Sequence, residues 1–304
     1  MSRNNRIGLY LLIFTVLLTF TRPSVAQSNL VFWGLDAYGI SDIPPGTYAS
    51  VAASYNFAVA IRTDGTLADW GTDDLGVGVL NAPSGTFKAV AADDWGGWAV
   101  GVRSDGTLTA WGDDRYGELN VPTGTFTAVT IWEAEGLALR PDGTVAIWGS
   151  GYGGNLTAPS GTFTAISGDV GLRADGTVEC FWGPDPPDGI YSSISWGHDG
   201  PIALQTDGTP VTWDGTNGGL PAPSGPLSAV SAGFGCDAAI RADGTLAIWD
   251  DSSDKAPLPS GTFSSVSAGW GYFLAIQAVP EPSSLLALVC GIAGAGGMFL
   301  FRRR

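Results

Sequence analysis

Residues 239–249 read Ala-Ile-Arg-Ala-Asp-Gly-Thr-Leu-Ala-Ile-Trp, and this stretch decides the fold of the chain. It contains a short apolar run, an Asp-Gly turn, a second apolar run and a tryptophan. Asp-Gly between two apolar runs is a strong hairpin signal, because glycine adopts positive φ at no steric cost. We therefore predict two antiparallel strands joined by a tight turn.

The same hairpin pattern recurs along the chain. Six Asp-Gly-Thr turns begin at Asp64, Asp105, Asp142, Asp175, Asp207 and Asp243. Seven tryptophans close the repeats, namely Trp33, Trp70, Trp111, Trp148, Trp182, Trp213 and Trp249. Their spacing averages roughly 36 residues, a length that helical repeats share, but the short β-branched and aromatic runs favour strands.

The two ends of the repeat array are complementary halves of one unit. Residues 31–34 look like the end of a repeat whose beginning is missing, and residues 265–277 look like a beginning whose end is missing. Open stacks of repeats need polar caps at both ends, which complementary halves do not provide. We therefore predict an all-β fold, a seven-bladed β-propeller over residues 27–278, closed by pairing of its N-terminal and C-terminal strands.

The charge distribution limits the classes of partner. All 29 Asp and Glu residues lie between Asp36 and Glu281, a region that contains eight of the 14 Lys and Arg residues. An acidic surface of this kind repels phosphate groups, so we exclude nucleic acid as a partner. The excess of acidic residues in this region is sufficiently explained by the need for solubility outside the cell.

The repeat resembles that of a known family. The matching residues include 89–92 (Ala-Val-Ala-Ala), 239–249 and 113–120 (Asp-Asp-Arg-Tyr-Gly-Glu-Leu-Asn). These residues are similar to the regulator of chromosome condensation repeat family, in particular to its short-bladed secreted bacterial members such as the β-lactamase inhibitor protein of the second type. The resemblance covers all seven units and implies a propeller. The family's usual histidine at the start of the second strand is replaced by Phe57 and Trp98, and the nucleotide-exchange and chromatin roles are not carried over.

Residues 1–26 have the features of a secretory signal peptide. Arg3 and Arg6 precede an apolar run at 9–20, and small residues at 24–26 are placed for cleavage. The apolar run is too short to span a bilayer comfortably. We expect export, cleavage by signal peptidase and a mature chain that begins at Gln27.

Residues 279–304 form a second targeting signal, in which an apolar segment at 284–301 lies between a proline-rich motif and a basic end. The motif residues are Val279, Pro280, Glu281, Pro282, Arg302, Arg303 and Arg304. Eighteen helical residues span roughly 27 Å, which suits a transmembrane helix with its arginines in the cytoplasm. The combination is similar to the PEP-CTERM sorting signal of exopolysaccharide-producing bacteria, which an exosortase recognises and cleaves. This resemblance implies an inner-membrane-tethered precursor that is later sorted to the cell surface or extracellular matrix; an ordinary membrane anchor is the alternative.

The twelve tryptophans fall into two sets. The seven that close a repeat form a structural ring, because each can fill the wedge between neighbouring sheets. The other five lie between the first and second strands of a repeat, at the end of the molecule opposite the Asp-Gly turns. With nearby aromatics and acids they predict a partner-binding surface at Tyr55, Trp95, Trp132, Trp196, Phe234, Trp270 and Tyr272. Phe57 and Trp98 directly adjoin the second strand and are expected to be buried; the alternative for the whole set is that the rings plug the propeller axis.

We predict no catalytic, cofactor-binding or metal-binding residue. His198 is the only histidine, and no nucleophile–base motif or phosphate-binding loop accompanies it. The Asp-Gly-Thr aspartates are expected to form turns. The paired acids at 73–74, 93–94, 113–114 and 250–251 follow no complete calcium-loop pattern and are expected to lie in solvated loops. Calcium binding and an acid pair acting on a glycan both stay open.

Three functions are compatible with these features. The first is an exported, surface-sorted, non-enzymatic propeller that binds a protein or glycan through aromatic and acidic loops on one face. The second is a structural protein of the cell envelope or exopolysaccharide matrix without a discrete ligand. The third is a hydrolase that acts on polysaccharide.

Overall fold

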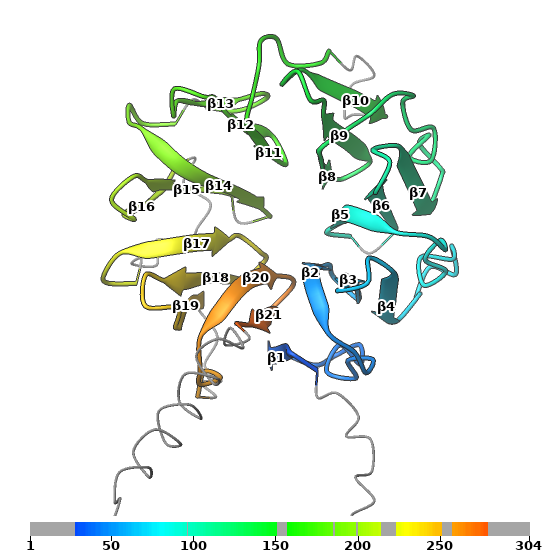
Figure 1. The fold of residues 1–304 in the computed structure, drawn as a ribbon, viewed down its shortest axis with the longest axis horizontal. Helices are drawn as coiled ribbons and strands as arrows, with labels where there is room; N and C mark the ends of the chain where they lie inside the picture. Colours follow the sequence, from blue (N-terminus) through cyan, green and yellow to red (C-terminus); the bar gives the residue numbers. More distant parts are fainter. Residues whose placement is uncertain are drawn as a thin grey trace, which may run out of the picture.

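The computed structural model describes residues 28–95, 97–150, 157–184, 186–198, 200–213, 223–250 and 257–278. The regular structure of this part of the chain is entirely β. It consists of 21 strands in seven three-stranded antiparallel sheets. The sheets are arranged around a common centre, and the innermost strand of each sheet is its first in chain order, except in the sheet that includes the N-terminal strand (Figure 1).

The sheets follow one another along the chain. The first contains β2 (Tyr48–Ala53), β3 (Phe57–Arg62) and β4 (Leu67–Gly71), and the second β5 (Phe87–Ala92), β6 (Trp98–Arg103) and β7 (Leu108–Gly112). The third contains β8 (Ala128–Trp132), β9 (Glu135–Leu139) and β10 (Val145–Gly149), and the fourth β11 (Ala165–Ser167), β12 (Val170–Leu172) and β13 (Val178–Cys180). The fifth contains β14 (Tyr191–Gly197), β15 (Gly200–Gln205) and β16 (Pro210–Thr212), and the sixth β17 (Leu227–Ser231), β18 (Cys236–Arg241) and β19 (Leu246–Asp250).

The seventh sheet joins the two ends of the described chain. It is formed by β20 (Phe263–Ala268), β21 (Tyr272–Gln277) and the N-terminal strand β1 (Leu30–Gly34). The pairing between β1 and β21 is antiparallel, with Trp33 opposite Phe273. The seventh sheet also packs on the first, because residues of both sheets share one buried apolar cluster.

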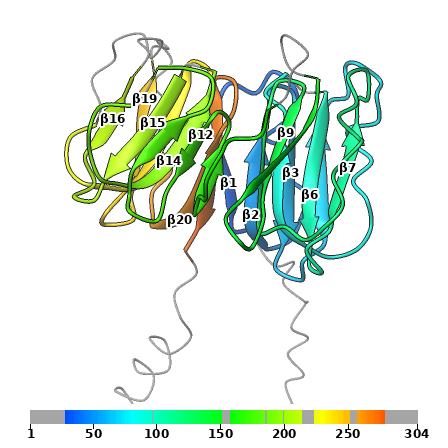
Figure 2. The ribbon, with the colours of Figure 1, turned by 90° about the horizontal axis from the view of Figure 1, so that it is seen from above.

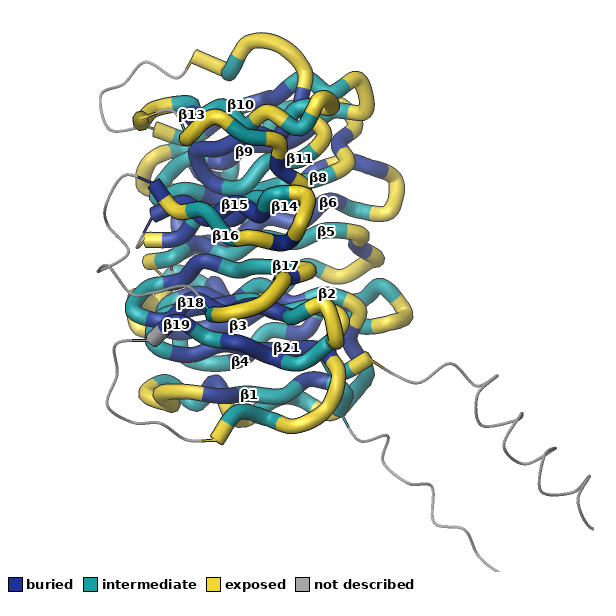
Figure 3. The backbone as a smooth tube through the Cα atoms, turned by 90° about the vertical axis from the view of Figure 1, so that its left-hand side faces the viewer, coloured by how far each residue is buried: buried dark blue, intermediate teal, exposed yellow. Residues whose placement is uncertain are grey.

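The expected targeting segments at 1–26 and 279–304 lie outside the described residues. Within the described part, no helix is long and apolar enough to cross a lipid bilayer. Figure 2 shows the strands running between the two ends of the molecule. Exposed residues gather in the loops at these ends, whereas the strands are mostly buried or partly buried (Figure 3).

The Asp-Gly-Thr turns link each sheet to the next. In the first turn the Gly65 N–H donates to the Arg62 carbonyl oxygen at 2.8 Å, and Gly65 has a φ of 87°. This is a type I turn followed by a left-handed glycine, one residue longer than a minimal hairpin turn. The Gly65 carbonyl oxygen then accepts the N–H of Phe87, the first residue of the next sheet, at 2.8 Å. The other five Asp-Gly-Thr turns make the equivalent bond.

Asn29 provides this link at the junction of the seventh and first sheets, where the chain has no Asp-Gly-Thr turn. Its side-chain Oδ1 accepts the N–H of Tyr48 at 2.8 Å, and its Nδ2 donates to the Tyr48 carbonyl oxygen at 2.9 Å. The Asn29 carbonyl oxygen accepts the N–H of Gln277 at 2.7 Å. One residue therefore connects β21 to the first strand of the first sheet.

Six of the seven predicted ring tryptophans are buried, and Trp182 is not. Trp182 is 45% exposed and lies beyond the end of β13. The neighbouring Phe181 donates its N–H to the Asp169 carbonyl oxygen at 2.7 Å and continues the strand register. Because successive residues of a strand face opposite sides, a shift of one residue exchanges the buried and exposed rings. The assignment of Trp182 to the ring was wrong, and Phe181 takes its place.

Candidate partner-binding site

Two kinds of loop meet at one end of the molecule. Where the structure describes both segments, the loop between the first and second strands of a sheet lies beside the segment that follows the third strand. For example, Thr72 donates its N–H to the Asn56 carbonyl oxygen at 2.8 Å, and Asp113 donates to the Gly97 carbonyl oxygen at 2.9 Å. The Asp-Gly-Thr turns lie at the opposite end, because each strand reverses the direction of the one before. We call the end that contains the first set of loops the aromatic end.

Aromatic and imidazole rings from five sheets form a continuous cluster at the aromatic end. We name this set the axial cluster, and it consists of Tyr38, Tyr55, Trp95, His198, Phe234 and Trp270. Trp270 is central, with its ring centroid 4.2 Å from that of Tyr55 and 4.4 Å from that of Phe234. His198 joins Phe234, at 4.4 Å, to Trp95, at 5.8 Å.

The axial cluster both fills space and presents a surface. The cavity between its rings measures only about 10 Å³, so the rings pack closely. Backbone bonds hold two of its loops together, because Phe234 donates its N–H to Gly269 and accepts one from Gly271. Trp95 is nevertheless 53% exposed, and His198 is also exposed. The two interpretations of the aromatic loops, an axial plug and a contact surface, therefore describe the same rings.

Two of the predicted contact residues form a separate pair. The ring centroids of Trp132 and Trp196 lie 5.4 Å apart, and both side chains are partly buried. Trp196 packs over Gly168, and a Cβ added to Gly168 would lie 2.4 Å from the Trp196 Cγ. The loop between β11 and β12 has only two residues, against three between β2 and β3, and it makes room for a ring from the fifth sheet. Phe57 and Trp98 are fully buried, as expected.

Tyr272 does not belong to the contact surface. It is 1% exposed, and its hydroxyl donates to the Ser54 carbonyl oxygen at 2.8 Å. Tyr272 is the first residue of β21, the same register position that Phe57 and Trp98 occupy in their sheets. Its prediction as a binding residue was wrong because this position points into the core in every one of these sheets.

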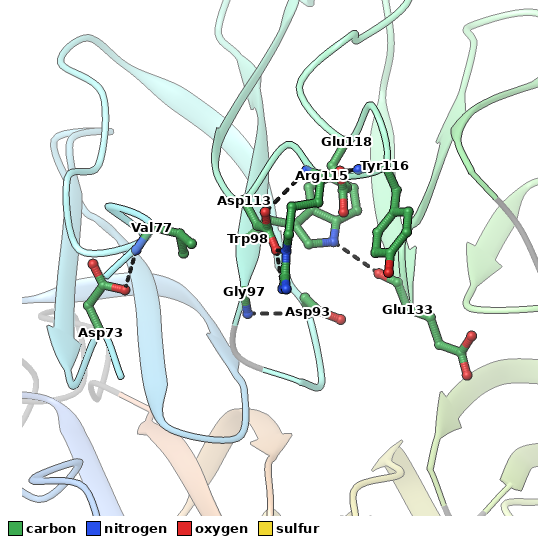
Figure 4. A network of polar contacts seen from close by, with 10 residues as sticks. All are labelled: Asp73, Val77, Asp93, Gly97, Trp98, Asp113, Arg115, Tyr116, Glu118 and Glu133. Carbon is green, nitrogen blue, oxygen red and sulfur yellow. Dashed lines mark hydrogen bonds and ion pairs between the residues drawn. The ribbon is translucent and has the colours of Figure 1, made fainter. Parts of the chain in front are cut away.

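A pocket of about 540 Å³ opens at the aromatic end between the second and third sheets. We call it the acidic pocket. Its lining includes Asp93, Trp95, Arg115, Tyr116, Glu133 and Glu135, several of which are drawn in Figure 4. Trp95 belongs to both the axial cluster and the acidic pocket, so the two features form one continuous surface.

Asp93 is the buried carboxyl group of this pocket. It is 5% exposed, and its Oδ2 accepts the N–H of Gly97 at 3.3 Å. Its Oδ1 is buried and has no hydrogen-bond partner in the protein. The hydroxyl of Ser54, from the first sheet, donates to the Asp93 backbone carbonyl and fixes the loop. The expectation that acids 93 and 113 lie in solvated loops was wrong, since Asp113 is also buried.

Burial controls the protonation of these acids. It raises the pKa of the Asp93 carboxyl to about 7; the backbone hydrogen bond from Gly97 opposes the rise, and the charges of Asp94 and Glu118 add to it. Burial also raises the pKa of Asp94, to about 6. For Asp113 burial acts in the same direction, but hydrogen bonds from Arg115 outweigh it and lower the pKa.

Glu133 is held in an unusual backbone conformation at the edge of the acidic pocket. Its φ of 52° is the only positive value at a non-glycine residue in the described part of the chain. Such conformations cost free energy and are maintained by their surroundings. Here the Trp98 indole Nε1 donates to the Glu133 carbonyl oxygen at 2.9 Å (Figure 4). Burial raises the pKa of the Glu133 carboxyl, and the nearby His198 lowers it.

Most of the described arginines lie at the other end of the molecule, beside the aspartates of the Asp-Gly-Thr turns. Five arginines lie where the second strand of a sheet ends beside an Asp-Gly-Thr turn, namely Arg62, Arg103, Arg140, Arg173 and Arg241. Arg115 is the only Lys or Arg among the pocket-lining residues, and its Nε donates to Asp113 Oδ2 at 2.6 Å. Among the described residues, no group of three His, Cys, Asp or Glu side chains is arranged to hold a metal ion.

Comparison with known proteins identifies the fold. No protein-family model matches the chain, and no curated protein matches its sequence. The CRINKLY WD40 ectodomain of the Arabidopsis thaliana receptor kinase ACR4 is 20% identical with a TM-score of 0.60, over 73% of this chain and 89% of that one. Human WBSCR16 is 14% identical with a TM-score of 0.61, over 78% and 89%. Yeast RCC1 (Prp20), in complex with Kap60, is 14% identical with a TM-score of 0.61, over 86% and 92%. The chain therefore has an RCC1-like β-propeller fold.

Proposed function

We propose that this chain is an exported, non-enzymatic β-propeller that binds a partner macromolecule, a protein or a glycan, through its aromatic end. The observation that carries the proposal is the axial cluster, in which rings from five sheets meet beside the acidic pocket and two of them, Trp95 and His198, are exposed. Aromatic rings give large contact areas at low cost in conformational entropy, and charged groups add specificity. Yeast RCC1 (Prp20), which has the same fold, is observed in complex with Kap60.

Closure of the seven sheets into a ring is part of this proposal. The pairing of β1 with β21 and the contacts of Asn29 with Tyr48 support it. A closed ring holds the loops of the aromatic end at fixed positions. A partner then meets a preorganised surface, which lowers the entropy lost on binding.

We also propose that the chain is exported and sorted to the cell surface. The features at 1–26 and 279–304 support this, through signal peptidase at one end and an exosortase-type protease at the other. Mass spectrometry of the protein released from the cell surface tests it. Processed ends after residue 26 and near residue 280 are expected, whereas an intact chain in the cytoplasm would contradict the proposal.

A tryptophan substitution tests the binding role. Trp95→Ala removes a ring that is mostly exposed, so we expect an unchanged unfolding temperature and loss of binding to isolated envelope proteins or polysaccharides, applied separately. Trp182→Ala is the matched control, because it removes an exposed ring that is not part of the axial cluster. Equal binding by both variants would refute the proposal. If the wild-type chain binds neither the envelope proteins nor the polysaccharides, the result would favour a matrix protein without a discrete ligand.

The hydrolase alternative has one observation in its favour, the buried Asp93 with its raised pKa beside a pocket. A carboxyl of this kind is suited to a general acid. Release of reducing sugars from envelope polysaccharides by the wild-type chain, and its loss in Asp93→Asn, would establish that alternative and replace the non-enzymatic proposal.

A further inference from the structure

The acidic pocket contains more negative charge than its own residues neutralise. Its lining has five carboxyl groups and one guanidinium, those of Asp93, Asp113, Glu118, Glu133, Glu135 and Arg115. Arg115 is occupied by its ion pair with Asp113. Glu118 is buried, and its Oε2 accepts the Tyr116 N–H at 2.7 Å. The other three acids, Asp93, Glu133 and Glu135, therefore have no partner cation among the residues that line the pocket.

Asp93 shows where a ligand group is missing. Buried carboxylate oxygens in proteins almost always accept hydrogen bonds, and leaving one unsatisfied costs free energy. Asp93 Oδ1 lacks such a bond, although the side chain lines the pocket. Figure 4 shows the Asp93 carboxyl with one oxygen near Gly97 and the other directed away from it. A positively charged N–H donor in the pocket would satisfy this oxygen and balance the charge.

The shape of the pocket favours an organic cation over a metal ion. A metal ion needs several carboxylates converging on one point, and no such group of three occurs among the described residues. The pocket of about 540 Å³ is instead large enough for a side chain, and Trp95, Trp98 and Tyr116 contribute to its wall. Lysine and arginine combine an apolar stem with a cationic head that is attracted to aromatic faces. We infer that the acidic pocket receives a lysine or arginine side chain of a protein partner.

The position of Trp95 favours a protein as the source of this cation. Because Trp95 joins the acidic pocket to the axial cluster, a partner that fills the pocket also covers the neighbouring rings. A folded protein that projects one basic side chain fits both features, whereas a neutral glycan would leave the carboxylates unbalanced. This inference rests on the proposed function, since it identifies the chemistry of the partner that the aromatic end binds.

A hexa-arginine peptide is the probe for the test, with binding to the purified full chain measured by calorimetry at pH 8 and low salt. We expect Asp93→Asn and Glu133→Gln each to weaken binding by about tenfold, as expected for loss of one charge from a desolvated pair. Asp188→Asn is the matched control, because Asp188 is exposed and does not line the pocket. We expect its affinity to stay within twofold of the wild type. Equal weakening in all three variants would show attraction by net charge alone and would overturn the inference.

Two further probes test whether the cation comes from a glycan or is a metal ion instead of a protein side chain. A glucosamine hexamer whose amines have been converted to guanidinium groups keeps its positive charge at pH 8 on a glycan, and calcium is a compact cation. Tighter binding of the glucosamine hexamer than of the peptide, or calcium binding that Asp93→Asn abolishes, would overturn the inference. No peptide binding, combined with capture of a partner that Trp95→Ala abolishes, would refute the inference but leave the proposed function intact. Specific peptide binding without any Trp95-dependent partner would refute the proposed function instead.

Discussion

At the scale of a single residue, Asp93 lowers the stability of the folded chain at neutral pH and lines the pocket proposed to bind a cation. Its carboxyl has a pKa of about 7 in the folded chain, against an ordinary value of 3.8 for an aspartate. The folded state therefore binds the proton more tightly than the unfolded state. Stability is then greatest below pH 4 with respect to this group, and it falls as the pH rises towards 7. Asp94 acts in the same direction, with a pKa of about 6.

We predict that Asp93→Asn stabilises the chain at pH 8 and has little effect at pH 4. The amide keeps the hydrogen bond from Gly97 and removes the buried charge, so the free energy of unfolding at pH 8 should rise by about 2 kcal/mol. Urea unfolding at the two pH values measures this difference. A lower stability at pH 8 would mean that the Asp93 carboxylate is stabilised in the folded chain by a contact that the amide cannot replace.

Sequence reasoning singled out the acid pair at 93–94 but expected it in a solvated loop, and the physical cause of this error is distance along the chain. The loop is buried by Ser54, 39 residues earlier, and the carboxyl lies across the pocket from acids of the next sheet. A pair of adjacent aspartates looks like any solvated loop until these neighbours are known. Tyr55, Trp95, Phe234 and Trp270 were predictable because they repeat at one position. His198 does not repeat, and only the fold brings it to them.

At the scale of an element, β13 shows how one residue changes the face of a strand. Counting four residues from the threonine of an Asp-Gly-Thr turn leads to the closing tryptophan in the other turns, but from Thr177 it leads to Phe181. The adjacent Trp182 was assigned to the ring because the other sheets have tryptophan at this position. The turn, which sets the strand register, was the better guide.

We predict unequal effects of the two ring deletions at this site. Phe181→Ala should cost about 2–3 kcal/mol, because Phe181 packs against Phe163 with ring centroids 5.3 Å apart. Trp182→Ala should change the free energy of unfolding by less than about 1 kcal/mol, since its ring is largely exposed. Chemical denaturation of both variants gives the comparison. The reverse order would restore Trp182 to the structural ring.

Asn29 directly precedes β1, and its substitution tests the junction between the seventh and first sheets. We predict that Asn29→Ala lowers the free energy of unfolding by about 1–3 kcal/mol, because it removes two hydrogen bonds to the Tyr48 backbone. Hydrogen exchange should then increase first in β1 and β21. Asn81→Ala is the control, since Asn81 is exposed and should have little effect. Unchanged exchange in β1 after Asn29→Ala would show that β1 is held by strand pairing alone.

At the scale of the whole molecule, the two ends differ in chemistry. The repeat pattern predicted seven sheets and placed the aromatic loops opposite the Asp-Gly-Thr turns, because both follow from strand direction. The acidic pocket was not predictable in this way, since it depends on how two neighbouring sheets pack. Accessible rings and unbalanced carboxylates lie at one end, and the strand-ending arginines at the other. The unbalanced carboxylates of the acidic pocket attract a basic partner to the aromatic end, and we expect its association to slow at high salt.

The most direct test of partner binding is a hydrogen-exchange footprint of the full chain in complex with the partner that Trp95→Ala fails to hold. We predict protection of the loops at 54–56, 93–95, 132–135, 233–235 and 269–271, with unchanged exchange in the six Asp-Gly-Thr turns. Protection of those turns, or of the outer strands, with the aromatic end unprotected would contradict the account.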